Sequence, residues 1–276
     1  MAGTLFVVAT PIGHLDDITA RALRVLGEVS LVAAEDTRRT GNLLRHFGLT
    51  TPVLSLHAHN EGARVPDLIA RLQAGASVAV VSDAGTPGIS DPGGGLIRAA
   101  REAGIRIEAV PGPSAVAAAI SIAGLDRPGF CFMGFTPTKP AERASWMADV
   151  SRLTDTLAIV SFEAPHRIRQ TVEELGSFVD YPIMVFRELT KRFEETIHGT
   201  PADILAKLEQ PRGEFTLVIP RRPAGHATVE QLPESDWPAE IGRLTENGAA
   251  SRREAARILA RRLGVSTKRV YDATRN

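Results

Sequence analysis

The feature that most constrains this 276-residue chain is an alternation of short, β-branched runs with amphipathic segments about ten to fifteen residues long. From Thr4 to about Leu125 each run is nearly continuously apolar, which is typical of strands covered by helices on both faces. Such alternation predicts βαβ units on a parallel sheet. The predicted strands of this first part span residues 5–10, 31–35, 53–57, 77–82 and 105–110.

A second series of apolar runs follows a break at residues 125–129, LDRPG. Its predicted strands span residues 130–135, 157–162, 183–188, 193–199 and 215–220, and the fourth of them reads as an edge strand. Several of these runs follow one another without room for a full helix. We therefore expect a mixed sheet with helices on one or both faces.

The whole chain is thus predicted to be an α/β protein of two domains with a small helical module. We expect an N-terminal α/β domain over 1–124, a C-terminal α/β domain over 125–222, a linker over 223–238 and a basic, helix-turn-helix-like module over 239–276. Asp91 and Pro92 predict the N-cap and first residue of one helix, and Pro113 opens another. In the module, Ser251 with Glu254 predicts a capping box, Gly264 a helix stop and Ser266 a second cap.

Charge and cysteine content bear on the partners of the protein and on its location in the cell. The chain has 32 basic and 32 acidic residues, so net charge alone indicates neither a nucleic acid nor a membrane partner. Residues 248–276 nevertheless hold eight Lys or Arg and two acids. The single cysteine, Cys131, has no partner for an intrachain disulfide, and residues 1–10 read as a buried strand rather than a secretory signal. We therefore expect a cytoplasmic protein that is not embedded in a membrane.

Three loops rich in glycine and proline follow the carboxyl ends of predicted strands. They are TPIGHLDD from Thr10, SDAGTPGISDPG from Ser82 and PGPSA from Pro111. In an open parallel sheet ligands bind at this edge, where glycines let the backbone approach a ligand closely. The chain contains neither a G-x-G-x-x-G fingerprint nor a Walker A sequence. A dinucleotide or NTP site of the usual type is therefore not supported.

Together with LFVVATPIGHLDDIT, AAEDTRRTGNLLRHFG, FEAPHRI, RELTK and GEFTLVI, these loops resemble the tetrapyrrole-methylase superfamily. Within it the chain is similar to the branch that modifies small-subunit ribosomal RNA, and the resemblance covers nearly the whole sequence. It implies a two-domain tetrapyrrole-methylase-like fold, S-adenosylmethionine bound between the domains, and a homodimer. It also implies methyl transfer to the 2′-hydroxyl of a cytidine in the decoding region of 16S rRNA. The expected partner is therefore 16S rRNA or the small ribosomal subunit.

The resemblance also implies which residues contact the cofactor. In the first domain these are Pro11, Asp83, Gly85, Thr86, Ser114 and Ala115. Phe162 and Phe215 are added from the second domain.

Methyl transfer from a sulfonium needs no metal, because the leaving group is already activated, and we expect no metal site. The ribose hydroxyl must be deprotonated or polarised by a nearby carboxylate, histidine or neutral lysine. Glu35, Asp36, His57, His59 and Glu163 lie near predicted loops, and we select Asp36 and Glu163 as catalytic candidates. Helix capping or ion pairing is the competing interpretation for any one acid.

The basic residues suggest where RNA phosphate is contacted. The candidates are Arg38, Arg39, Arg252, Arg253, Arg257, Arg261, Lys268 and Arg269, and Lys191 and Arg192 have the same potential. Two other functions stay open. The fold also suits a methyltransferase that acts on a tetrapyrrole-like small molecule, and the basic module also suits a helix-turn-helix DNA-binding sensor.

Overall fold

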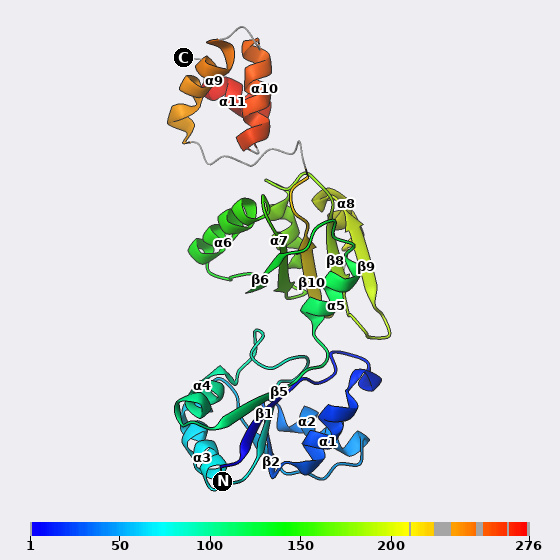
Figure 1. The fold of residues 1–276 in the computed structure, drawn as a ribbon. Helices are drawn as coiled ribbons and strands as arrows, with labels where there is room; N and C mark the ends of the chain where they lie inside the picture. The colour runs from blue at the N-terminus through cyan, green and yellow to red at the C-terminus, as the bar shows by residue number, and fades with distance from the viewer. Residues whose placement is uncertain (1, 210, 224–232, 247–250, 264, 275–276) are drawn as a thin grey trace. The chain divides into compact units, whose positions relative to one another are not determined.

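A computed structural model describes residues 2–209, 211–223, 233–246, 251–263 and 265–274, without the side chains of residues 246, 261 and 262. The chain divides into two compact units (Figure 1). The first contains Met1–Ile122 and Glu188–Glu194, and the second contains Ala123–Arg187 and Glu195–Asn276. A short segment from the second half of the chain is thus part of the first unit.

The first unit is built on a five-stranded parallel sheet in the order β3-β2-β4-β1-β5. Its strands are β1 (Thr4–Val8), β2 (Leu31–Ala34), β3 (Val53–Ser55), β4 (Val78–Val81) and β5 (Arg106–Val110). Every residue of β2 and β4 is buried, as expected for central strands with both faces covered. The parallel sheet predicted from the sequence is confirmed.

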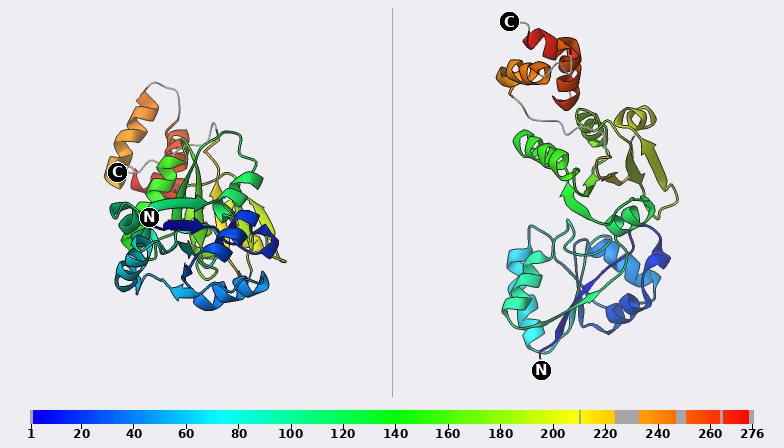
Figure 2. Two further views of the ribbon diagram at one scale, coloured as in Figure 1. Left: turned by 60° about the horizontal axis from the view of Figure 1, so that its bottom comes forward. Right: turned by 45° about the horizontal axis from the view of Figure 1, so that its top comes forward.

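Helices cover both faces of this sheet (Figures 1 and 2). On one face α1 (Ala20–Glu28) and α2 (Thr37–His46) pack through Ala22, Val25, Leu26 and Leu44. On the other, α3 (Glu61–Gln73) and α4 (Gly94–Glu102) pack through Leu68, Leu72, Leu96 and Ala100. A further helix, α5 (Ala115–Ile122), follows β5.

The strand order creates a switch point. From β1 the chain moves through β2 to the edge strand β3, whereas from β4 it moves in the opposite direction to β5. Because β4 and β1 are neighbours, their connections leave the sheet in opposite directions. The carboxyl ends of such a strand pair are the usual ligand site of an open α/β sheet.

The second unit contains a mixed sheet in the order β6-β7-β10-β8-β9. The strands are β6 (Phe130–Phe135), β7 (Ala158–Glu163), β8 (Ile183–Arg187), β9 (Glu195–Gly199) and β10 (Phe215–Ile219). Only β6 and β7 pair in parallel, and β9 lies at the edge as predicted. A shared core joins the sheet to α6 (Pro140–Leu153), α7 (Ile168–Leu175) and α8 (Pro201–Lys207).

The C-terminal module contains a 3₁₀ turn, η2 (Glu234–Asp236), followed by α9 (Trp237–Glu246), α10 (Arg252–Leu263) and α11 (Thr267–Ala273). Its core is formed by Trp237, Ile241, Ala255, Ala256, Leu259, Ala260, Leu263 and Val270. The Ser266 hydroxyl caps α11 as predicted, and the Ser251 hydroxyl accepts the Glu254 N–H at 3.3 Å. Gly264, and residues 224–232 of the predicted linker, lie outside the described residues. The structure differs from the prediction in α9. This helix begins within the predicted linker, and the sequence did not indicate it as a separate helix.

The predicted start of α4 was wrong. Asp91 is not its N-cap and Pro92 is not its first residue, because α4 begins at Gly94 with Gly93 as its N-cap. Gly93 has a φ of 108°, a left-handed conformation that glycine adopts without strain, and no side chain caps the helix. This leaves the Asp91 carboxylate free of the helix end.

Candidate active site at the switch point of the first unit

The three loops predicted from the sequence meet at the switch point. Thr10, after β1, and Gly85, after β4, exchange two backbone hydrogen bonds of 2.9 Å. The Thr86 hydroxyl donates to the Pro113 carbonyl in the third loop at 3.1 Å. Since β4, β1 and β5 are neighbours in the sheet, these bonds join loops that are distant in sequence.

The loop over residues 82–93 has a backbone that few residues tolerate. Gly85, Gly88 and Gly93 have φ values of 77°, 82° and 108°, and Ser90 has a φ of 67°. A Cβ at Gly85 would lie 3.3 Å from the Ile12 side chain in the first loop. Positive φ at a non-glycine residue costs about 1–3 kcal/mol and is concentrated at functional sites. A loop with such a backbone is a candidate for close contact with a ligand.

The segment over residues 188–194 packs on the first loop, a contact that the sequence did not predict. The Thr190 hydroxyl accepts the His14 N–H at 3.2 Å. A Cβ at Gly13 would lie 2.5 Å from the Lys191 side chain and 3.0 Å from the Leu189 carbonyl oxygen. Glycine at position 13 thus allows this approach. Within the sequence, only the RELTK motif at residues 187–191 pointed to this segment. Neither β-propensity nor periodicity indicates which loop the connection between β8 and β9 contacts.

Carboxylates gather at the same edge of the sheet. Asp83 accepts the Asp36 N–H at 2.9 Å and pairs with the Arg39 guanidinium at 3.3 Å, which ties the start of α2 to the long loop. Burial, followed by the charge of Asp83, raises the pKa of Glu35. Burial also raises the pKa of Asp91 to about 6, and the charges of Glu35 and Asp83 act in the same direction. A carboxylate with a pKa of about 6 is able to accept a proton near neutral pH, whereas the sequence indicated only a capping role for Asp91.

Asp36 lies beside these carboxylates and caps a helix. Its carboxylate accepts the N–H groups of Arg38 and Arg39 and so caps α2. These two hydrogen bonds lower the pKa of Asp36. A carboxylate with a lowered pKa is a weaker base, so the geometry favours capping for this residue. The side chains of Arg38 and Arg39 are exposed at the same edge.

Glu163 belongs to a buried polar network in the second unit. Its side chain is 0% exposed and pairs with Arg167 at 2.7 Å. It also accepts hydrogen bonds from the Thr171 hydroxyl and the Ala164 N–H. Arg143 extends the network by donating to Thr171 and pairing with Glu174 at 2.6 Å. These contacts account for the position of Glu163 by structure alone.

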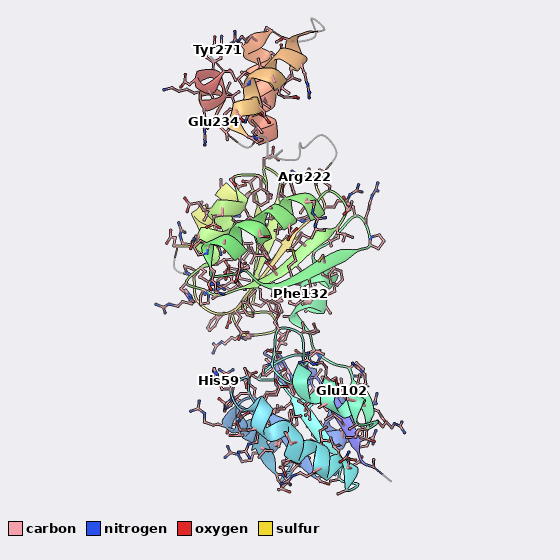
Figure 3. The ribbon with its side chains drawn as sticks, turned by 90° about the vertical axis from the view of Figure 1, so that its left-hand side faces the viewer. His59, Glu102, Phe132, Arg222, Glu234 and Tyr271 are labelled. Atoms are coloured by element: carbon pink, nitrogen blue, oxygen red, sulfur yellow. The ribbon has the colours of Figure 1, made fainter. Side chains whose placement is uncertain are left out.

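The other cofactor candidates occupy varied positions. Pro11 is buried in the first loop, the Ser114 carbonyl accepts the Ala118 N–H, and Ala115 is the first residue of α5. In the second unit Phe162 contacts the rings of Phe132, labelled in Figure 3, and Phe135, at centroid distances of 4.9 and 5.5 Å. Phe215 is 2% exposed and belongs to the core of the second unit. Its strand pairs with β7 on one side and β8 on the other.

In the C-terminal module the side chains of Arg252, Arg253, Arg257, Lys268 and Arg269 are exposed. The Arg261 side chain lies outside those that the structure describes. Across the described part of the chain, no group of three His, Cys, Asp or Glu side chains is arranged to hold a metal ion. Among the helices described, none has the length and apolar character needed to cross a membrane.

Comparisons with known proteins agree with this fold. The family model of the Tetrapyrrole (Corrin/Porphyrin) Methylases matches residues 4–205. The methyltransferase CobJ superposes with a TM-score of 0.60 at 20% identity, over 81% of this chain and 98% of its own. A uroporphyrin-III C-methyltransferase from Thermus thermophilus, complexed with S-adenyl homocysteine, superposes with a TM-score of 0.56 at 17% identity, over 78% and 97% of the chains. The fold and the matched residues define a tetrapyrrole methylase, and the chain belongs to that family.

More similar relatives carry a single name, ribosomal RNA small subunit methyltransferase I. The protein of this name from Synechocystis is 43% identical over 98% of this chain and 96% of its own length. The one from Escherichia coli O157:H7 is 40% identical over 98% of this chain and 93% of its own length. The chain groups with these relatives inside the family.

Proposed function

We propose that this protein transfers a methyl group from S-adenosylmethionine to the 2′-hydroxyl of a cytidine in the decoding region of 16S rRNA. The observation that carries the proposal is the set of three loops joined at the switch point of the first unit, in a chain that shares about 40% identity with enzymes named for rRNA methylation. The substrate is 16S rRNA or the small ribosomal subunit. We also propose a homodimer and a cytoplasmic location.

The loops fit the proposed cofactor. Gly85 lets the long loop pack closely on the first loop, because a Cβ there would lie 3.3 Å from the Ile12 side chain. S-adenosylmethionine supplies an activated methyl group and carries a positive sulfonium. Asp83, Glu35 and Asp91 complement that positive charge at the sheet edge. Pro11, Thr86, Ser114 and Ala115 complete the proposed cofactor contacts in this unit, and Phe162 and Phe215 are proposed from the second.

The proton of the ribose hydroxyl needs an acceptor. Asp36 and Glu163 stay candidates, although capping and ion pairing already occupy their carboxylates. Asp91 is the stronger candidate in the first unit, because its pKa of about 6 leaves it ionised, yet basic, at neutral pH. Positioning of the two reactants supplies much of the remaining rate.

Basic side chains supply the proposed grip on RNA. Arg38 and Arg39 are exposed beside the loops, and Arg192 lies over the ring of Phe193, which is 71% exposed, in the segment that packs on the first loop. The cations of the C-terminal module, Arg252, Arg253, Arg257, Arg261, Lys268 and Arg269, add phosphate contacts from a separate part of the chain. Such contacts fix position on RNA without reading its sequence.

The test is methyl transfer to small ribosomal subunits from cells that lack the enzyme, using methyl-labelled S-adenosylmethionine. Digestion and mass spectrometry then map the labelled nucleotide. We expect label on one cytidine ribose. Label on a base, or on no RNA at all, would refute the proposed substrate.

Parallel reactions separate the two alternatives. Transfer to a tetrapyrrole carbon but not to RNA would favour the small-molecule enzyme. Specific binding of duplex DNA without methyl transfer would favour the DNA-binding sensor.

A further inference from the structure

Among the described residues of the C-terminal module, most cations have a partner and two have none. Arg257 pairs with Glu254 at 3.3 Å, Arg243 with Glu240 at 3.5 Å and Arg269 with Glu234 at 3.6 Å, while Arg252 donates to the Thr274 carbonyl. Arg253 and Lys268 are exposed and have no hydrogen bond or ion pair to any described residue. An unpaired cation keeps its full charge for a partner, whereas a paired one gives up part of it.

These two cations line the same hollow as an exposed aromatic ring. Arg253 of α10, together with Thr267, Lys268, Tyr271 and Asp272 of α11, lines an open hollow of about 380 Å³, which we call the Tyr271 hollow. Tyr271, labelled in Figure 3, is 43% exposed, whereas the neighbouring Val270 is 0% exposed and Trp237 4%. The module core therefore does not require the tyrosine ring.

The side chains that line the Tyr271 hollow suit a nucleotide with an accessible base better than the phosphate backbone alone. A tyrosine face stacks on any unpaired base, and cations in the same hollow can contact the flanking phosphates. The Asp272 carboxylate would repel a phosphate placed beside it, but it accepts hydrogen bonds from base amino groups. Bases in a duplex are already stacked, so the ring favours a single strand over duplex DNA.

We propose that the Tyr271 hollow binds an unpaired RNA nucleotide, with its base stacked on Tyr271 and its flanking phosphates contacted by Arg253 and Lys268. This inference rests on the proposed RNA substrate and names the part of it that the module holds. Among the basic residues of the module, Arg253 and Lys268 are thus proposed to bind RNA together with Tyr271, a residue that a search for positive charge would not indicate.

The test measures the affinity of full-length protein for a labelled, single-stranded 12-nucleotide RNA by fluorescence anisotropy, with a 12-base-pair DNA duplex in parallel. Tyr271→Ala should weaken RNA binding about tenfold, and Tyr271→Phe should keep it within about twofold, since stacking needs only the ring. Arg253→Gln should weaken binding and make its salt dependence shallower. Arg243→Gln is the matched control, an exposed but paired arginine outside the hollow, and should change little.

A second variant keeps the test valid if Tyr271→Ala misfolds. Tyr271→Trp introduces an exposed indole, whereas the native Trp146 and Trp237 are only 6% and 4% exposed. Stacking should quench its fluorescence when RNA is added. Unchanged affinity in a folded Tyr271→Ala protein, no quenching in Tyr271→Trp, or tighter binding to the duplex would each overturn the inference.

Methylation of ribosomal subunits by the same variants separates this inference from the proposed function. If wild-type protein methylates subunits while Tyr271→Ala binds RNA normally, only the inference fails. If wild-type protein methylates no RNA, the proposed function fails first.

Discussion

At the scale of single residues, Asp91 makes folding stability depend on pH. Burial raises its pKa from 3.8 to about 6, so between about pH 4 and pH 6 the folded state binds a proton that the unfolded state has released. The contribution of Asp91 to the free energy of unfolding is therefore largest below about pH 4 and is lost as the pH rises through 6.

Asp91→Asn should remove this dependence. At pH 7 we expect the variant to be more stable than wild type by about 1 kcal/mol, after allowance for solvent screening, and at pH 4 the difference should nearly vanish. Urea unfolding at the two pH values measures it. An equal difference in the free energy of unfolding between variant and wild type at both pH values would show that folding does not raise the pKa of Asp91. Methyl transfer by the same variant tests its proposed role as base.

Glu163 offers a second test at this scale, because its carboxylate is the buried partner of Arg167. Glu163→Gln leaves the guanidinium without a counter-charge, and breaking a buried ion pair in this way costs about 3–5 kcal/mol. Urea unfolding should show a loss at or below this range, since glutamine keeps some hydrogen bonds. Glu173→Gln, an exposed acid on the same helix α7, is the control. A stable but inactive Glu163→Gln would instead support a catalytic role.

At the scale of elements, the contact between the first loop and segment 188–194 depends on Gly13. Gly13→Ala would place its Cβ 2.5 Å from Lys191 Cγ and 2.6 Å from Thr190 Oγ1, so one of the two segments must move. We expect a stability loss of about 1–3 kcal/mol and faster tryptic cleavage after Lys191 or Arg192. Gly41→Ala is the matched control, because no atom lies within 4 Å of its Cβ. Equal cleavage rates in the two variants would contradict the contact.

The elements themselves follow closely from the sequence. Each strand in the described part of the chain overlaps a predicted one, and the central strands such as β2 and β4 do so because they are apolar runs buried along their whole length. Contacts between elements are encoded less directly. Segment 188–194 joins the first unit through tertiary packing, and Asp91 misses the end of α4 because Gly93 adopts a left-handed conformation. At the site, the loops could be predicted, whereas the raised pKa of Asp91 depends on burial that only the fold creates.

At the scale of the whole molecule, we expect cofactor binding and RNA binding to be separable. A chain ending at Pro223 removes the C-terminal module but keeps Arg222, labelled in Figure 3. That arginine pairs with Asp155 at 2.9 Å, and its backbone N–H donates to the Thr154 carbonyl at 2.7 Å, so the last strand stays anchored.

The shortened chain should bind S-adenosylmethionine with nearly unchanged affinity. Its RNA affinity should fall about tenfold or more, with a shallower salt dependence, because basic phosphate contacts have been removed. Calorimetry for the cofactor and anisotropy for RNA measure the two quantities on one sample. Equal loss of both affinities would contradict the claim that the C-terminal module contributes to RNA binding and not to cofactor binding.

The most direct test of the central claim, that the joined loops of the first unit hold the methyl donor, is the affinity of full-length protein for S-adenosylmethionine by calorimetry, compared between Gly85→Ala and Gly104→Ala. Both glycines have left-handed φ values, 77° and 69°, so both variants carry similar backbone strain. Only at Gly85 would the Cβ contact another loop. We predict tight binding by wild type and Gly104→Ala and a loss of about tenfold or more in Gly85→Ala. Equal affinities in the two variants would contradict the claim.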